Sequence, residues 1–519
     1  MNNPMATLRQ SIFLSLFALL VSASAVRADV KPAPLFSDHV VLQSGMPVPI
    51  WGTAAAGENV TVTLNGQAKS ATTGADGKWM VRLTDLKAGG PYEMTIAGSN
   101  TITVKDVLVG EVWLGSGQSN MQFTVSKKSA GFAGLINEEQ EIAAANYPKL
   151  RMFMGKSAIT YEPQASIDGQ WQVCSPETVP GFSAVAYLFG RNLQKELDVP
   201  VGMLVLAFGA STAEAWIPRE AMAADPLLKP MLDNFDAEIQ FHKAQPDAPP
   251  DQGPKAPQTI NARVGQPPRG GGRGGGRGGG RDPARDQHEP TVLYNGMINP
   301  AIPYAIRGAI WYQGESIVGG SHGIDLYPHV METMVKTWRK LWGEGDFPFY
   351  AVQLPALQNI SNNPRVREGQ AAIASLPNAG YAVTIDIGDP KDVHPHNKEP
   401  LGDRLMRMAL ANVYHRNIEY SGPVYQSMAI EGSTIRIKFT HLGGGLVAKD
   451  GPLKWFQISG ADRQFVDAEA KVDGDTVVVS RPDVTMPEHV RYAWVNYPEG
   501  CNLYNAAGLP AGPFRTDQW

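Results

Sequence analysis

Residues 107–123 read VLVGEVWLGSGQSNMQF. An apolar run typical of a buried strand ends on Gly115 and Gly117, and a bulky apolar tail follows. Glycines after a strand permit a sharp turn where a β-carbon would clash, and such a turn can project a serine hydroxyl beyond the strand. Ser119 stands just past these glycines, in a spacing that differs from Gly-x-Ser-x-Gly. Serines in such turns are more often structural, so Ser119 as a nucleophile needs partners elsewhere in the chain.

The pattern of an apolar run followed by a helical segment continues from about residue 106 to 415. Strand-like runs lie at 107–115, 201–209, 305–314, 349–355 and 381–388, and amphipathic helical patterns lie at 184–197 and 327–342. Strands that alternate with helices predict an α/β domain with a parallel sheet covered by helices on both faces. In such sheets, sites form at the carboxyl ends of the strands.

Two β-rich regions flank this central domain. Short alternating runs with turn signals predict a β-sandwich over 29–105 and a further β-rich domain over 416–519. A Pro-, Gly- and Arg-rich insert interrupts the central domain from about 236 to 289, and we expect it to be a disordered surface loop. Its arginines resemble RNA-binding segments, but a solvated linker is favoured in an exported protein.

The first residues indicate the compartment of the protein, and the composition argues against some classes of partner. Residues 1–28 have the charged start, apolar core and small-residue cleavage site of a signal peptide, which predicts a periplasmic or secreted protein. Their apolar run is too short to favour stable membrane insertion. A net charge of −5 and a pI of about 6.1 give no reason to expect nucleic acid. Cys174 and Cys501 are too few for a thiolate zinc cluster and are favoured as separate buried thiols.

Three more loops follow predicted strands and contain residues suited to ester chemistry. Gly209 allows its backbone N–H to approach a ligand, and the amide of Gln313 can donate to a developing oxyanion. His394, preceded by aspartates, can act as a general base. Each is more often structural when judged alone. The spacing His394-x-His396 is a weak metal signal, so we expect neither a metal nor a cofactor.

Together, the four loops predict acyl transfer by a serine. His394 would deprotonate Ser119, which attacks an ester carbonyl, while the N–H groups of Ser119 and Gly209 and the amide of Gln313 stabilise the oxyanion. The acidic partner of His394 is left open between Asp392, which we favour, Asp389 and Glu315. The expected substrate contacts from the same loops are Gln118, Asn120, Trp311, Tyr312 and Glu315. Arg404, beyond the histidine loop, is a candidate cation for the carboxylate of an acidic sugar, and it could equally cap the helix that it begins.

At these loops the sequence resembles the sialate O-acetylesterase family of the SGNH/GDSL hydrolase superfamily, which has acetylxylan esterase relatives. The resemblance rests on LQSGMPVPIWGTA, GEVWLGSGQSNM, LYNGMINPAIPYAIRGAIWYQGES, DVHPHNKEPLGDRL and NLYNAAGLPAGPFRTD. It implies a three-layer α/β/α hydrolase domain with β-rich accessory domains, which removes O-acetyl groups from sugars without a metal. Ser119 matches the family's nucleophile, His394 its base, and Gly209 and Gln313 its oxyanion-hole positions.

The sequence departs from the family pattern in three places. Residues 208–211 read FGAS where the family usually has WGGT, Ile317 replaces an asparagine, and the Arg–Gly insert is not a family feature. Lys391 stands where many SGNH enzymes have the aspartate that supports the histidine. Acetylated sialic acid, acetylated xylan and other cell-wall glycans all remain open as substrates. A non-catalytic glycan-binding protein is less favoured, because the nucleophile and the base are both present.

Overall fold

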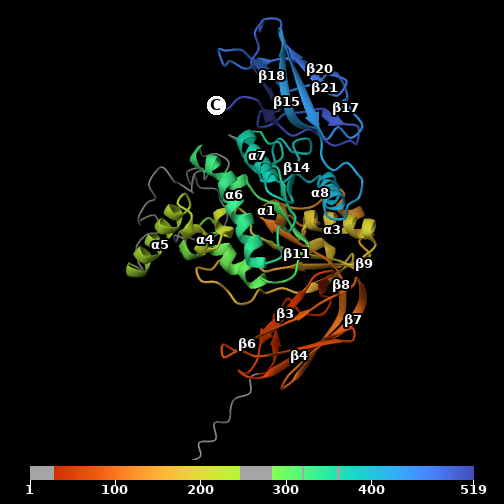
Figure 1. The fold of residues 1–519 in the computed structure, drawn as a ribbon, viewed down its shortest axis with the longest axis vertical. Coiled ribbons are helices and arrows are strands. Elements are labelled where there is room, and N and C mark those ends of the chain that lie inside the picture. Colours follow the sequence, from red (N-terminus) through yellow and green to blue (C-terminus); the bar gives the residue numbers. More distant parts are fainter. Residues whose placement is uncertain (1–28, 246–282, 318–320, 359, 361–362) are drawn as a thin grey trace, which may run out of the picture.

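The computed structural model describes residues 29–245, 283–317, 321–358, 360 and 363–519. The expected signal peptide and the arginine–glycine run lie outside these described residues. Within the described part, no helix has the length and apolar character needed to cross a membrane. Figure 1 shows N-terminal strands at one end of the long axis, a helix-covered sheet in the middle and C-terminal strands at the other end.

A parallel sheet forms the middle of the molecule, as the alternating pattern predicts. Its strand order is β10-β9-β11-β8-β12-β13-β14, and only the edge strand β10 pairs antiparallel among these described strands. The last strand ends earlier than expected, because Val383 and Ile385 pack into the core of the C-terminal strands. The strands are β8 (Thr101–Gly117), β9 (Tyr147–Met154), β10 (Trp171–Cys174), β11 (Val201–Ala207), β12 (Gly308–Tyr312), β13 (Phe349–Val352) and β14 (Ala379–Ala382).

Helices cover both faces of this sheet. On one face, Trp113 of β8 lies against Phe189 of α3, with ring centroids 5.1 Å apart. On the other face, Trp311 of β12 lies against Trp338 of α6, at 5.8 Å. The coarse prediction of a mixed α/β fold is therefore confirmed. The helices are α3 (Ala184–Leu197) and α8 (Glu399–Asn412) on the first face and α6 (Ser321–Trp342) and α7 (Asn363–Ala371) on the second.

The N-terminal strands share one apolar core with the central sheet. Val60, Val62 and Leu64 alternate along β4 and are all buried in it. Because β8 continues from these strands into the parallel sheet, the domain boundary expected near residue 105 falls within one strand. The other strands of this region are β1 (Lys31–Pro32), β2 (Val41–Gln43), β3 (Val48–Thr53), β4 (Asn59–Leu64), β5 (Gln67–Thr72), β6 (Lys78–Leu83) and β7 (Gly89–Ala97).

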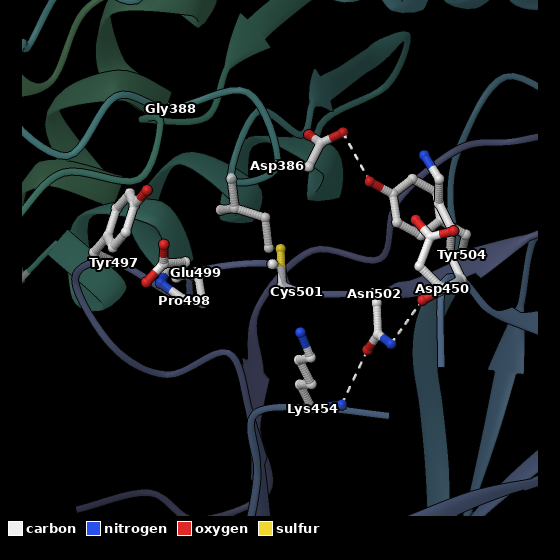
Figure 2. A pocket seen from close by; sticks show the side chains of 13 residues that line it. Asp386, Gly388, Asp450, Lys454, Tyr497, Pro498, Glu499, Cys501, Asn502 and Tyr504 are labelled. Atoms are coloured by element: carbon white, nitrogen blue, oxygen red, sulfur yellow. Dashed lines mark hydrogen bonds between the residues drawn. The ribbon is translucent and has the colours of Figure 1, made fainter. Parts of the chain in front are cut away.

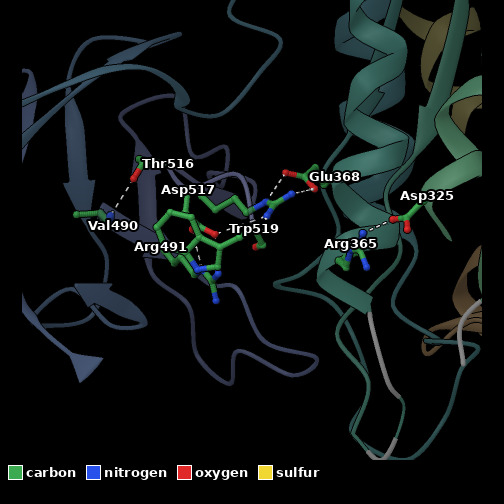
Figure 3. A network of polar contacts seen from close by, with 9 residues as sticks. Asp325, Arg365, Glu368, Val490, Arg491, Thr516, Asp517 and Trp519 are labelled. Atoms are coloured by element: carbon green, nitrogen blue, oxygen red, sulfur yellow. Dashed lines mark hydrogen bonds and ion pairs between the residues drawn. The ribbon is translucent and has the colours of Figure 1, made fainter. Parts of the chain in front are cut away.

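The C-terminal strands enclose a second apolar core. The end of the chain is attached to α7, because Arg515 donates to both carboxylate oxygens of Glu368, at 2.8 and 3.0 Å. Close to Glu368, Arg491 pairs with Asp517 (Figure 3). These strands are β15 (Val424–Glu431), β16 (Thr434–Thr440), β17 (Leu446–Ala448), β18 (Phe456–Ser459), β19 (Val466–Asp467), β20 (Glu469–Asp473), β21 (Thr476–Ser480), β22 (His489–Tyr492), β23 (Leu503–Asn505) and β24 (Phe514–Arg515).

The Pro-, Gly- and Arg-rich insert is shorter than the expected range of 236–289. Helix α5 (Lys229–Ala244) follows α4 (Arg219–Ala224) and covers the first part of that range. Its apolar face buries Phe235 and Ile239, and an amphipathic face of this kind stabilises a helix by packing. Residues 283–289 are also described, and Pro283 is buried. The disordered-loop prediction now concerns only residues 246–282, which lie outside the described part.

The two cysteines are both free and buried, which confirms their interpretation as separate thiols. Burial raises the pKa of each thiol to about 12, so neither is a reactive thiolate at neutral pH.

Candidate active site

The turn that carries Ser119 joins the end of β8 to the short helix α1 (Ser119–Gln122). Gly117 has a φ of +131°, and a β-carbon there would come within 2.1 Å of the Tyr312 carbonyl oxygen, so the position requires glycine. The backbone N–H of Gln118 donates to the same oxygen at 2.8 Å. The turn is therefore tied to the end of β12, and Ser119 is set at the carboxyl edge of the parallel sheet.

His394 lies directly against this serine. Its Nε2 is 2.8 Å from Ser119 Oγ, within the range of a nucleophile and its base. Burial lowers the pKa of His394 below its ordinary value, and the positive charge of Lys398 lowers it further. The ring is therefore neutral at pH 7, and a neutral ring nitrogen can accept the serine proton.

Asp392 is the one of the three acidic candidates that contacts the His394 ring. Its Oδ1 is 3.5 Å from Nδ1, too long for a strong hydrogen bond, and the same oxygen accepts the backbone N–H of His394 at 2.8 Å. Asp389 instead accepts the backbone N–H groups of Lys391 and Asp392, and Glu315 accepts from Asn120. The arrangement places Asp392 as a weak partner that chiefly shapes the histidine loop.

Beneath the serine, Asn120 bridges two buried charges. Its Nδ2 donates to Glu315 Oε1 at 2.6 Å and to the Val393 carbonyl at 2.9 Å, while its Oδ1 accepts from Lys398 Nζ at 2.7 Å. Asn120 is completely buried and Lys398 is 1% exposed. The bridge joins three of the four predicted loops, because Asn120 follows β8, Glu315 follows β12 and Lys398 follows the histidine. It holds the nucleophile loop and the histidine loop together.

Both charges of this bridge are strongly affected by burial. Burial lowers the pKa of Lys398 to about 7, although the carboxylate of Glu315 opposes the shift. Burial also raises the pKa of Glu315, against the hydrogen bond from Asn120. The Lys398 ammonium lies over the rings of Phe123 and Tyr312, at 4.5 and 5.3 Å from their centroids, which compensates part of its lost hydration.

Gly209 lies beside the serine, because a β-carbon built on it would be 3.6 Å from Ser119 Cβ. Its N–H, however, donates to Gln122 Oε1 at 2.7 Å, and Gln122 Nε2 donates to the Ala207 carbonyl at 2.8 Å. Gln122 therefore occupies the donor that was predicted for the oxyanion. The next residue, Ala210, has a φ of +55°, a conformation that favours glycine and explains why glycine is usual there in the resembling family.

Gln313 is completely buried between its neighbouring loops. Tyr327 OH donates to its Oε1 at 3.0 Å and so fixes the orientation of the amide. Its Nε2 then donates to the Ser211 carbonyl at 3.1 Å. An amide nitrogen has two hydrogens, so this bond leaves a second N–H.

The expected substrate contacts require correction. Five of those six residues are less than 9% exposed and lie in the interior: Gln118, Asn120, Trp311, Tyr312 and Arg404. Trp311 and Tyr312 pack in the core, and Gln118 accepts the backbone N–H of Gly314. Aromatic and amide groups at a strand end can point inward or outward, and the local sequence is the same in both cases. We reassign these side chains to holding the loops. Glu315 is partly exposed as a whole residue, but its carboxylate is buried where it accepts from Asn120.

Arg404 has a structural partner rather than a free guanidinium. It donates to both oxygens of Asp386, at 2.8 and 2.6 Å, and Asp386 also accepts from Tyr504 OH at 3.1 Å. Figure 2 shows the Asp386–Tyr504 contact at a cavity between the histidine loop and the C-terminal strands. Asp386, on the loop that carries the base, therefore contacts both Arg404 of α8 and Tyr504 of the C-terminal strands.

Two residues of the site were missed from sequence. Lys398 follows His394 by four residues, and a lysine just before a helix ordinarily indicates a solvent-exposed side chain. Gln122 follows Ser119 on the next helical turn, which is the only local signal that it lies near the nucleophile.

Comparison with known proteins shows which proteins this chain resembles. Residues 279–411 match the family model described as carbohydrate esterase, sialic acid-specific acetylesterase. The chain is 29% identical to the rat sialate O-acetylesterase, with 96% of this chain and 97% of that protein covered. It is 28% identical to the human sialate O-acetylesterase, with 92% and 90% covered.

A solved structure extends the likeness to the whole fold. The crystal structure of a carbohydrate acetylesterase from Xanthomonas citri is 31% identical, covers 95% of this chain and 100% of its own, and superposes with a TM-score of 0.79. The chain therefore belongs to the sialic acid-specific acetylesterase family and is a carbohydrate esterase.

Proposed function

We propose that the chain removes O-acetyl groups from sugars by covalent serine catalysis, with Ser119 as nucleophile and His394 as base. The observation that supports this most directly is the 2.8 Å contact between Ser119 Oγ and His394 Nε2 at the carboxyl edge of the sheet. The histidine is neutral at pH 7, and the serine stands next to Gly209, whose backbone approaches it closely. The same pair would be unnecessary in a protein that only binds glycans.

The reaction proceeds in two steps. Ser119 passes its proton to His394 Nε2 as Oγ bonds to the acetyl carbonyl carbon, and the carbonyl oxygen becomes an oxyanion. The proton then moves from His394 to the sugar oxygen as the C–O bond breaks, which leaves the acetyl group on Ser119. Water attacks this acetyl-enzyme and gives its proton to His394, and collapse of the second tetrahedral intermediate releases acetic acid and restores the serine.

The oxyanion is stabilised by three donors in this proposal. The backbone N–H of Ser119 and the second N–H of Gln313 are two of them. The Gly209 N–H becomes the third when the substrate oxygen displaces Gln122 Oε1, the acceptor that it now contacts at 2.7 Å. Asp392 stabilises the imidazolium weakly, in keeping with its 3.5 Å separation from Nδ1.

The wider setting of the reaction is part of the same proposal. The parallel sheet with helices on both faces supports a three-layer domain of the SGNH type over about 106–415, with β-rich regions at 29–105 and 416–519. The signal-peptide pattern of residues 1–28 supports export to the periplasm or beyond. We place acetylated sialic acid first among substrates, because the rat and human relatives are sialate O-acetylesterases. Acetylated xylan is the second candidate. It has no carboxylate to bind, and Arg404, the cation expected for a sialic acid carboxylate, is paired with Asp386.

A covalent label tests the proposed nucleophile. Diisopropyl fluorophosphate should add one diisopropylphosphoryl group to Ser119, with loss of fluoride, and should abolish acetate release; peptide mass spectrometry detects the adduct. The activity is measured on an O-acetylated methyl sialoside and on O-acetylated xylobiose. An enzyme that releases acetate at the same rate after complete labelling, or that carries the adduct on Ser116, contradicts the assignment. Absence of acetate release from both sugars contradicts the substrate class.

The low pKa of His394 predicts the acid side of the pH profile. The base is active when deprotonated, so kcat/KM should fall only below about pH 6.5, the ordinary pKa of histidine. Lys398→Met removes a nearby positive charge that lowers this pKa, and the midpoint should then move to higher pH. Lys391→Met, at an exposed lysine of the same loop, is the control and should leave the midpoint in place. A Lys398→Met profile that shifts to lower pH would contradict this electrostatic coupling.

A further inference from the structure

The catalytic histidine is covered on one side by a loop that the reaction scheme does not use. Residues 126–137, here called the 126–137 loop, follow α1 and precede α2 (Glu138–Ala144). The loop is fixed to the histidine segment, because the N–H of Ile136 donates to the His396 carbonyl at 3.1 Å and His396 Nδ1 contacts the Gly134 carbonyl. It therefore has a defined position beside the site.

This loop places an exposed aromatic ring against the base. The Phe132 ring lies 4.9 Å from the His394 ring, centroid to centroid, with the planes inclined by 45°. Phe132 also contacts the buried Phe123 at 6.3 Å, yet 40% of its surface is exposed. Ile136 on the same loop is 76% exposed. Large apolar side chains exposed together mark a binding surface more often than isolated ones do.

We propose that Phe132 is the sugar platform of this esterase, on which the pyranose ring of the acetylated substrate stacks. The inference rests on the proposed function and adds the contact that selects sugars over other acetate esters. In that reaction the leaving sugar oxygen takes its proton from His394 Nε2, so the sugar ring must lie beside the imidazole. Phe132 is the exposed ring that contacts that imidazole in the described residues.

The physical basis is the apolar face of a sugar. The axial and equatorial C–H groups of a pyranose form flat apolar patches, and burying such a patch on an aromatic ring removes apolar area from water. The aromatic residues expected to do this, Trp311 and Tyr312, are 1% exposed and have their rings packed in the apolar core, so neither offers a flat face to a sugar. Phe132 supplies the exposed aromatic face that Trp311 and Tyr312 lack, and it lies beside the imidazole that protonates the leaving sugar oxygen.

Substitutions of Phe132 separate stacking from support of the histidine. Phe132→Leu keeps an apolar side chain against His394 but removes the flat ring, and Phe132→Trp keeps a ring. We expect Phe132→Leu to raise KM by about 5- to 10-fold for an O-acetylated methyl sialoside or O-acetylated xylobiose, the worth of about 1 kcal/mol of stacking. Phe132→Trp should retain the KM of wild type. Hydrolysis of ethyl acetate, which has no ring to stack, should change less than about twofold in either variant.

One control variant and the comparison of the two esters make the result decisive. Ile430→Ala alters an apolar side chain that is 54% exposed on β15. It should leave the KM for the sugar ester and the rate of ethyl acetate hydrolysis unchanged. Equal losses on the sugar ester and ethyl acetate in Phe132→Leu would show that Phe132 only supports His394, and an unchanged sugar KM would also overturn the platform. In either case the wild-type enzyme still releases acetate from the sugar ester, so the proposed function is unaffected. A wild type that cleaves neither ester overturns the proposed function and the platform with it.

Discussion

Ser119→Ala is expected to lower kcat for acetate release by about 10⁴- to 10⁶-fold, the loss seen when a serine nucleophile is removed from a triad-type site. The reason is chemical, since no other hydroxyl is 2.8 Å from His394 Nε2 among the described residues. Stability should change little, because a methyl group still fits the turn that Gly117 shapes. Acetate release and a thermal unfolding curve, measured on the same preparation, check both statements.

Ser116→Ala is the matched control for this result. Ser116 lies three positions earlier on β8, is completely buried, and its hydroxyl has no hydrogen-bond partner in the described structure. Its loss should leave kcat within about twofold, because removal of an unpaired buried hydroxyl is close to neutral. Activity that survives in Ser119→Ala, or that disappears in Ser116→Ala, would transfer the nucleophile assignment elsewhere.

Asp386→Ala is expected to lower the free energy of unfolding by about 3–5 kcal/mol, because it leaves the Arg404 charge buried without its partner. The side chains of Asp386 and Arg404 are each 9% exposed, and Tyr504 of β23 loses its acceptor as well (Figure 2). The substitution removes one polar contact between the histidine loop and the C-terminal strands. Urea unfolding, followed by tryptophan fluorescence, measures the loss.

The double substitution Asp386→Leu with Arg404→Met distinguishes a stranded charge from lost packing. An apolar pair of similar size avoids the buried charge and should cost less than Asp386→Ala alone. Glu499→Ala, at an exposed position on the same cavity, should change stability by less than about 0.5 kcal/mol. A double variant less stable than Asp386→Ala would show that the ion pair itself stabilises the junction.

Patterns that depend on neighbouring residues were predictable from sequence. The helix predicted over 184–197 is α3, and it begins at the N-cap Ser183, whose side chain accepts the N–H of Ala186. The parallel strands follow from the alternation of apolar runs with helical segments. The rule that carboxyl ends of parallel strands share one edge is also what brought Ser119, Gly209, Gln313 and His394 into one hypothesis.

The direction of individual side chains was not predictable in the same way. Trp311 and Tyr312 are expected from sequence at a sugar-binding surface, but they are the last residues of β12 and both lie in the core. Arg404 was expected at the substrate and is paired with Asp386 instead. The beginning of the insert was read as disordered, although its apolar positions form one face of α5. In each case the deciding partner is far away in sequence.

The sequence by itself determined the order of the elements, the four strand-end loops and the residue types that ester hydrolysis needs, because periodicity and turn chemistry are local properties. The tertiary structure alone decided what surrounds them. It set Asp392 at 3.5 Å from the His394 ring, buried Lys398 where its charge acts on that histidine, and laid Phe132 against the base. Burial and distance between residues far apart in the chain control charge, pKa and access, and they exist only after the chain has folded.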